Sequence, residues 1–359
     1  MKVLAIESTC DETAASLVES VRPSPRLRSD EIGIRVISTV VASSVTMHEK
    51  YGGIIPEIAA REQVRSIIPV IEESIGAESI KNVDAVAVSF GPGLMGSLLI
   101  GVETAKTLAW VWNKPLLKVN HISAHLLANW ITKDREPDGF RVMPGMTEIE
   151  NLTPEFPAVG LVASGGHTDF FLLESLEKWQ WIGGTRDDAV GEAFDKVGRI
   201  FDLPYPAGPA IDKISKEISD VEYRKLSKDN KLPRPLIHDK SLDMSFSGLK
   251  AAVSRLGDDI EKNLYIRDFS EAVTEVLVAK TRIALETYSP KTLLLGGGVA
   301  ANSKIREALK KLGEEFSIPF FVPELKYCGD NAAMIGAAAI LKPIEASFKD
   351  SPEPGMEVA

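Results

Sequence analysis

Two stretches, VLAIESTCDETAASLVE at residues 3–19 and AVGLVASGGHTDFFLLE at residues 158–174, follow the same plan. In each, a short apolar run leads into a polar tip and a second apolar run follows, which predicts a β-hairpin. Glycine in such a tip lets backbone N–H groups approach oxygen atoms closely, and successive amides form a concavity that binds anions. Two hairpins of this kind are typical of a two-lobed protein that grips nucleotide phosphates from both sides of a cleft.

The sequence between the hairpins alternates helical and strand patterns. Helices are predicted over 56–75 and 96–112, strands over 83–90 and 115–120, and a further helix within 119–130. Alternation of this kind implies an α/β fold with a largely parallel sheet.

Composition limits the class of protein. The chain has 359 residues, of which 44% are hydrophobic and 26% charged, as expected for a globular protein with room for two domains. The net charge of −10 disfavours a protein that grips nucleic acid over its whole surface, so such a partner would need a local basic patch or another subunit. Only two cysteines, Cys10 and Cys328, predict a reducing compartment, with the cytoplasm as default.

No membrane segment is predicted. Glu7 interrupts the N-terminal apolar run too early for a signal peptide. Residues 85–102 are uncharged and long enough to cross a membrane, but Gly91-Pro92-Gly93 divides them. A buried strand, a tight turn and a helix start fit this stretch better.

Two histidines share one face of the helix predicted within VNHISAHLLANW (119–130). His121 and His125 are four residues apart, so both imidazoles can converge on one point. This is the spacing of a two-histidine metal clamp, which needs a third ligand from elsewhere. Histidines satisfied within the helix remain the alternative. The Glu of the HExxH zinc-protease motif is absent, which disfavours a protease.

Asp330, in YCGDNAAMIGAAAI (327–340), lies where another helix is predicted to begin. It could be an N-cap, or it could be the missing carboxylate. With His121 and His125 it would complete a three-ligand site with open positions.

Three later loops fit a nucleotide. Asp195 lies in GEAFDK, Gly208 and Asp212 lie in a Pro/Gly turn and the predicted first turn of the next helix, and Asn302 follows a strand and three glycines. A strand–Gly–helix junction lets phosphate or ribose rest on bare backbone. A solvated acidic face, a helix-dipole acid and tight packing remain the alternatives for the three loops.

Ten motifs, in order along some nine-tenths of the chain, together resemble the TsaD family of tRNA adenosine threonylcarbamoyltransferases: ESTCDET, HEKYGGIIPEIAAREQ, FGPGLMGSLLIG, NHISAH, VASGGHTDF, GEAFDKVGR, YPAGP, SFSGLK, GGGVAANSKIR and CGDNAAMIGAAA. The resemblance implies two ribonuclease-H-like α/β lobes of the actin, sugar-kinase and heat-shock ATPase class, with a nucleotide in the cleft. It also implies transfer of threonylcarbamoyl from threonylcarbamoyl-AMP to the 6-amino group of the adenosine 3′ of the anticodon, in tRNAs reading codons that begin with A. AMP is released.

Matching motifs carry the family's functional residues onto this chain. The resemblance implies a metal, Fe²⁺ or Zn²⁺, on His121, His125 and Asp330, and a catalytic Asp11 with Glu12 beside it. It implies adenylate contacts at Val162, Ala163, Ser164, Gly165, Gly166, Asp195, Gly208, Asp212 and Asn302. Gln63 departs from the pattern because many bacterial members have His there, which leaves the role of that position in doubt. Residues 21–35 and 134–155 are longer than usual.

The resemblance also sets expectations for domains. The first lobe should span 1–133, with 327–342 packing back on it, and the second should span 156–326. Residues 134–155 mix charge, Pro and Gly without apolar period, which predicts an exposed crossing. The Pro-rich, charged composition of residues 343–359 predicts a flexible tail.

The expected partners are tRNA and, for a bacterial protein, a paralogous TsaB-type subunit and a TsaE-type small ATPase; an organellar protein would form a homodimer. Basic strips that could meet tRNA are Arg22, Arg26, Arg28 and Arg35, or Lys228, Lys231 and Arg234. Two alternatives stay open: a small-molecule kinase of the same superfamily, which would give the histidine pair no task, and a non-catalytic nucleotide-binding scaffold, which would be expected to lack that pair.

Overall fold

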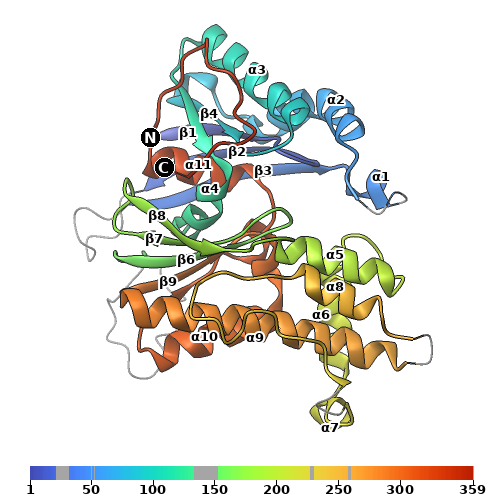
Figure 1. Cartoon of the computed structure of the whole chain (residues 1–359). Helices are drawn as coiled ribbons and strands as arrows, with labels where there is room; N and C mark the ends of the chain where they lie inside the picture. Colours follow the sequence, from blue (N-terminus) through green and yellow to red (C-terminus); the bar gives the residue numbers. More distant parts are fainter. Residues whose placement is uncertain are drawn as a thin grey trace. The chain divides into compact units, whose positions relative to one another are not determined.

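The computed structural model describes residues 1–21, 32–49, 51, 53–132, 153–226, 230–257 and 260–358. It divides into two compact units (Figure 1). Unit 1 comprises Met1–Glu155, Leu176–Lys178 and Asp330–Ala359, and unit 2 comprises Phe156–Ser175 and Trp179–Gly329. Most of the segments 21–35 and 134–155, together with Arg22, Arg26, Arg28 and Lys228, lie outside the described residues.

Unit 1 is built on a five-stranded sheet of order β3-β2-β1-β4-β5. Its strands are β1 (Lys2–Glu7), β2 (Glu12–Val21), β3 (Gly33–Ser43), β4 (Ala85–Gly91) and β5 (Leu116–Asn120). β1, β2 and β3 pair antiparallel, whereas β4 and β5 run parallel to β1. The sheet is therefore mixed, not largely parallel, because the hairpin supplies antiparallel pairs at one side.

Helices cover both faces of this sheet (Figure 1). The helices α2 (Pro56–Ile75) and α3 (Met95–Trp112) pack on the face that carries Leu4 and Ile6. On the other face lies α11 (Ala332–Leu341), where Gly336 comes so close to Val18 that a Cβ atom would lie 2.6 Å from its Cγ2. Every residue of α11 is buried, which explains its uninterrupted run of apolar residues.

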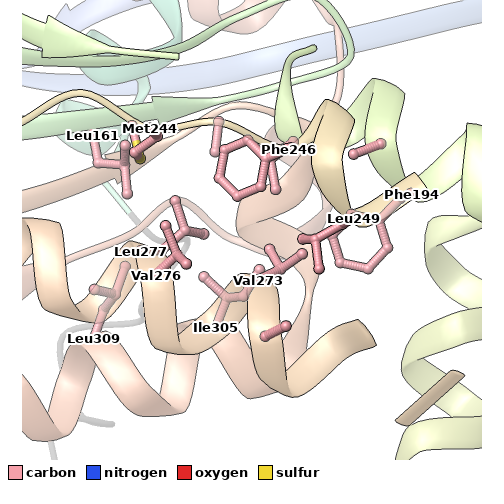
Figure 2. Packing of buried hydrophobic residues seen from close by; sticks show 14 of the residues in the cluster. Leu161, Phe194, Met244, Phe246, Leu249, Val273, Val276, Leu277, Ile305 and Leu309 are labelled. Carbon is pink, nitrogen blue, oxygen red and sulfur yellow. The ribbon is translucent and has the colours of Figure 1, made fainter. Parts of the chain in front are cut away.

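Unit 2 repeats the plan with the order β10-β9-β6-β7-β8. Its strands are β6 (Ala158–Ala163), β7 (Thr168–Leu173), β8 (Trp179–Gly184), β9 (Thr292–Gly296) and β10 (Phe320–Phe321). Its longer helices are α5 (Val190–Ile200), α6 (Gly208–Glu217), α9 (Lys262–Tyr288) and α10 (Ser303–Glu315), with shorter α7 (Asp220–Tyr223) and α8 (Ser247–Val253). Figure 2 shows side chains of α5, α8, α9 and α10 packed with Leu161 of β6 in one core.

The fold class predicted from the resemblance is confirmed. Both hairpins form: Glu7 pairs with Ala14 at the end of the first, and Ala163 pairs with Thr168 at the end of the second. The two units share one strand order, with the first strand of each hairpin at the centre of its sheet.

Residues 343–358, expected as a flexible tail, instead follow the surface of unit 1. The Lys118 amide donates to the Ile344 carbonyl at 2.9 Å, and the Ala346 amide donates to the Leu116 carbonyl at 2.8 Å. Further on, the Glu353 amide donates to the Phe90 carbonyl at 2.8 Å. β5 is an edge strand with unpaired backbone groups, and these contacts satisfy some of them.

The apolar stretch 85–102 is resolved as predicted into β4, a turn with a cis Gly91-Pro92 bond, and the start of α3. None of the helices in the described ranges combines the length and apolar character that crossing a membrane requires.

Candidate metal centre and nucleotide loops

A short helix at the end of β5 carries both histidines. α4 (His121–Leu127) begins where Asn120 caps it, its Oδ1 accepting the Ser123 amide at 3.0 Å. His121 and His125 are one turn apart and buried, and their ring centroids lie 4.7 Å apart in a T-shaped arrangement at 79°. The helical spacing therefore brings the two rings together as predicted.

Asp330 completes the group from the far end of the chain. Its Oδ1 lies 3.5 Å from His121 Nε2 and 3.3 Å from His125 Nε2. It is not the N-cap of the helix that follows: α11 begins at Ala332, and the Asn331 side chain accepts the Met334 amide at 3.0 Å. Because Asn331 caps the helix, the carboxylate of Asp330 is available to the histidines.

These three side chains fit a divalent metal ion. Their ligand atoms all lie within 4.8 Å of one another. Bonds of about 2.1 Å to a tetrahedral ion place neighbouring ligand atoms about 3.4 Å apart, close to both distances from Asp330. Among the described residues, neither ring nitrogen of the buried His125 has a hydrogen-bond partner. A coordinated cation would satisfy one of these nitrogens.

The charges of the cluster favour a cation. Burial alone would lower the pKa of His121, but the carboxylates of Glu7 and Asp330 raise it well above its usual value. Burial lowers the pKa of His125. Burial would raise the pKa of Asp330, yet the adjacent His121 holds it well below its usual range. The carboxylates thus hold a proton on His121, and a divalent ion would replace that proton because metal-bound histidine is neutral.

Glu7 orients His121, a contact that sequence reasoning missed. Its Oε2 lies 3.1 Å from His121 Nδ1, which leaves Nε2 to face Asp330. The Glu7 carboxylate also accepts the Thr9 amide at 2.6 Å and the hydroxyl of Ser89. A metal-ligating histidine commonly donates the N–H of its second ring nitrogen to a carboxylate. This hydrogen bond fixes which ring nitrogen carries the proton. The available signal was an acidic residue placed directly after the apolar run of β1, where it is buried.

We expect Glu7→Ala to weaken metal binding by about 10- to 100-fold, the usual effect of removing such an outer partner. Competition with a chromophoric chelator measures the affinity directly. Glu7→Gln should retain part of it, because its amide oxygen still accepts the Nδ1 proton. Glu19→Ala, on the neighbouring strand, is the control and should bind metal normally. An unchanged affinity in Glu7→Ala would reject this role.

The tip of the first hairpin holds the two predicted catalytic carboxylates. Asp11 is 8% exposed, and Glu12 begins β2. Burial, then the charges of Asp330 and Asp11, raise the pKa of Glu12 to about 10. These effects favour the protonated form of Glu12, next to the carboxylate of Asp11. A protonated carboxyl cannot accept a proton, so Glu12 is disfavoured as the general base and Asp11 stays the candidate.

In unit 2, hydrogen bonds connect the loops predicted to bind a nucleotide. Val162 and Ala163 end β6, and Ser164 follows them, with its carbonyl accepting the Gly191 amide of α5 at 3.1 Å. Asp195 of α5 accepts the Ala207 amide, next to Gly208, at 2.8 Å.

From α6 the connection continues to the last loop. Asp212 accepts a hydrogen bond from Ser303, next to Asn302, at 2.8 Å. Asp212 was predicted in the first turn of its helix. It lies further along, because α6 already begins at Gly208. Its partners are Ser303 and Lys216 instead of the helix dipole.

Two details leave room for a ligand in these loops. A Cβ atom added at Gly165, Gly166 or Gly208 would meet nothing within 4 Å, so local crowding does not explain these glycines. Asn302 Oδ1 caps α10 through the Ile305 amide at 3.1 Å, while its buried Nδ2 has no partner among the described residues.

Gly297 differs from those glycines. It has a φ of 93°, and a Cβ atom there would collide with the Ala163 carbonyl. Tight packing therefore explains this glycine of the GGG run, whereas Gly298 is open.

The fold and the site define a two-unit α/β protein with a His₂Asp metal-ligand cluster in unit 1 and open glycine loops in unit 2. The TsaD family model, described as tRNA N6-adenosine threonylcarbamoyltransferase, matches residues 35–145 and 139–337. The chain belongs to this family.

Curated relatives carry the same name. The tRNA N6-adenosine threonylcarbamoyltransferase of Persephonella marina is 42% identical over 345 residues, covering 93% of this chain and 88% of the relative. That of Bacillus subtilis is 40% identical over 371 residues, covering 100% of this chain and 96% of the relative. Among solved structures, component A of the Acidaminococcus fermentans (R)-2-hydroxyglutaryl-CoA dehydratase matches 95% of this chain and 96% of its own, with 12% identity and a TM-score of 0.49.

Proposed function

We propose that this chain transfers the threonylcarbamoyl group from threonylcarbamoyl-AMP to the 6-amino group of the adenosine 3′ of the anticodon in tRNA, releasing AMP. Family membership supports the reaction class. The observation that carries the proposal is the meeting of His121, His125 and Asp330 beside a hairpin tip with two further carboxylates. Binding a metal ion gives the two histidines a function in this reaction, whereas a kinase reaction would give them none.

The acyl donor is a mixed anhydride and needs no covalent nucleophile from the protein. The protein must position a weakly nucleophilic amine and stabilise the negative charge that develops on the carbonyl oxygen. A metal ion, Fe²⁺ or Zn²⁺, held by His121, His125 and Asp330, supplies Lewis-acid polarisation of that carbonyl when bound.

The chain's own residues do the rest. The backbone amides of Gly165 and Gly166 hold the phosphate of the adenylate. The Ser164 amide, also expected to do so, instead donates to the His167 carbonyl at 2.8 Å within the hairpin. The ribose and base are bound by Asp195, Gly208, Asp212 and Asn302. Asn302 contributes the buried Nδ2 donor that lacks a partner among the described side chains and main-chain groups.

Asp11 receives the proton. The attacking 6-amino nitrogen forms a bond to the carbamoyl carbon, the bond from that carbon to the AMP phosphate oxygen breaks, and the amine gives up one proton. Asp11 orients the amine and accepts that proton, while the Ser44 hydroxyl and amide hold its backbone carbonyl and Glu12 lies beside it.

The test is transfer of labelled threonylcarbamoyl from its adenylate to tRNA, with the metal content determined on the same sample. Transfer by the purified chain confirms the proposal. If metal binds but no label moves until a TsaB-type subunit and a TsaE-type ATPase are added, the chain is one component of a larger enzyme. Phosphorylation of a sugar by ATP, without transfer in either case, would overturn the proposal.

We further propose that a paralogous TsaB-type partner binds unit 1 at the surface formed by α2 and α3. We place this complex in the cytoplasm. Both helices of that face expose large apolar side chains: Val64 and Ile68 of α2 are 63% and 49% exposed, and Trp110 of α3 is 73% exposed. Apolar side chains grouped on neighbouring helices are typical of a protein interface. Size-exclusion chromatography of Trp110→Glu with and without the partner checks this assignment.

The described basic residues differ in whether they are free to bind tRNA phosphates or are already held in ion pairs. Arg35 forms an ion pair with Glu19, and Arg234 forms ion pairs with Asp268 and Glu275. We therefore propose Lys231, which lies over the ring of Tyr223, as the better candidate contact of the two strips.

A further inference from the structure

The motif HEKYGGIIPEIAAREQ (48–63) supplies none of the site residues described above, yet its first and last residues are buried polar side chains. His48 is 0% exposed and Gln63 is 1% exposed. His48 lies in α1 (Val45–Glu49), Gln63 lies in α2, and both belong to unit 1. Gln63 contacts the tip of the first hairpin directly, and His48 contacts it through Ser44.

Gln63 binds the backbone of the tip directly. Its Nε2 donates to the carbonyl of Cys10 at 2.9 Å, and it also lies within hydrogen-bond distance of the carbonyls of Glu12 at 3.2 Å and Ser8 at 3.4 Å. An amide nitrogen carries two protons, so these three carbonyls share them. One side chain of α2 thus gathers the carbonyls of alternate residues of the tip.

His48 reaches the tip through a serine. Its Nδ1 accepts the Ile55 amide at 3.3 Å, so the proton lies on Nε2, which donates to the Ser44 hydroxyl at 3.1 Å. That hydroxyl donates to the Asp11 carbonyl at 2.9 Å, and the Ser44 amide donates to the same carbonyl at 3.1 Å. Each group in this series of hydrogen bonds donates to the next one, from His48 through Ser44 to Asp11. The backbone of Asp11 is therefore held from a second side.

Packing alone does not hold this side of the tip. A small cavity of about 60 Å³ is lined by Asp11, Ser44 and Gln63, among others. The Oε1 atom of Gln63 is buried without a partner among the described residues, which costs free energy that an apolar side chain of the same size would avoid. Hydrogen bonds therefore contribute to the conformation of the tip here, and the Ser97 hydroxyl adds one to the Cys10 carbonyl at 3.1 Å.

We infer that Gln63 is a positioning residue for the transfer reaction: its amide holds the backbone of residues 8–12 so that the Asp11 carboxylate meets the amine, with His48 and Ser44 as a second support. This inference rests on the proposed function. A histidine at position 63 would have, as a neutral imidazole, only one N–H to offer. A histidine could therefore support one of the three carbonyls, but not share two protons among them.

The test compares Gln63→Met with Gln63→His. Methionine fills a similar volume without a donor. We expect Gln63→Met to lower kcat by about 10- to 100-fold, the effect of a small misplacement of a catalytic group, with KM for both substrates and metal content unchanged. Gln63→His should recover part of the lost kcat. Gln180→Met is the matched control, because Gln180 is the other glutamine of the chain and is exposed.

A second readout does not depend on activity. Hydrogen exchange of the amides of residues 8–14 should become faster in Gln63→Met and return toward the wild-type rate in Gln63→His. If wild type exchanges slowly and Gln63→Met quickly, while neither transfers threonylcarbamoyl under any condition, the support of the tip is real and the proposed function fails. If wild type transfers and Gln63→Met keeps its kcat and its exchange rates, the inference is overturned.

A merely structural role gives a different pattern, in which Gln63→Met loses metal, substrate affinity and kcat together, and this outcome also overturns the inference. If Gln63→Met does not fold, Ser44→Ala removes the hydroxyl that donates to Asp11 and should show the same fall in kcat and faster exchange. Normal values of both in Ser44→Ala would count against positioning by this network.

Discussion

His125→Ala is expected to purify as a folded protein without bound metal and without transfer activity. The substitution removes one of three ligand side chains, and the two that remain, His121 and Asp330, cannot close the site. Losing an outer partner of a ligand weakens binding by about 10- to 100-fold, so losing a ligand should exceed that range. Alanine favours helix, so α4 should persist. Elemental analysis, circular dichroism and the transfer assay on one preparation check all three outcomes.

His238→Ala is the control for this experiment, because His238 is exposed in unit 2. It should keep both metal and activity. Chelation of wild type followed by addition of Fe²⁺ or Zn²⁺ should restore transfer with the native ion and identify it. Normal transfer by metal-free His125→Ala would reject Lewis-acid polarisation as part of the reaction.

Asp11→Asn is expected to keep metal and adenylate binding but to transfer more slowly by about 10²- to 10⁴-fold, the range for loss of a general base. The asparagine side chain has the same shape, and the hydrogen bonds that Ser44 makes to this position go to its backbone carbonyl, which the substitution leaves intact. Single-turnover transfer with saturating adenylate isolates the chemical step from binding.

Asp202→Asn serves as the control, since the side chain of Asp202 is 84% exposed. It should transfer at the wild-type rate. A wild-type rate in Asp11→Asn would mean that another group takes the proton, and protonated Glu12 could not do so without first losing its own. Asp11→Asn combined with Gln63→Met should then be no slower than Gln63→Met alone.

Local pattern was enough to predict the two hairpins, the histidine helix and the helices and strands between residues 56 and 120, but it did not predict β3 or β8. These features depend on neighbours in sequence: the apolar runs of β1 and β2 on either side of a polar tip, and the four-residue spacing of His121 and His125. Only the N-cap alternative for Asp330 was off, by one residue: Asn331 caps α11, and because Asp and Asn are nearly equal as N-caps, sequence does not distinguish which of two adjacent residues ends the loop.

The supporting contacts could not be predicted in the same way. Glu7 and Gln63 each act on residues distant in sequence or on backbone carbonyls, whose directions exist only in the folded hairpin. Residues 343–358 were misjudged because their Pro-rich, charged composition is typical of a disordered tail. Backbone pairing with β5 depends on no particular side chain, so composition gives no sign of it.

The order of synthesis on the ribosome gives the placement of α11 a further meaning. β1 and β2 emerge long before the helix that covers one face of their sheet, which ends at Leu341. Unit 2 is encoded almost entirely between these two parts, so it can complete its core while unit 1 still exposes an apolar surface. Nascent chains shorter than this should need protection from aggregation. Only Asn331 lies between Asp330 and α11, so the ability to retain metal should arise in the same late step that closes the first unit.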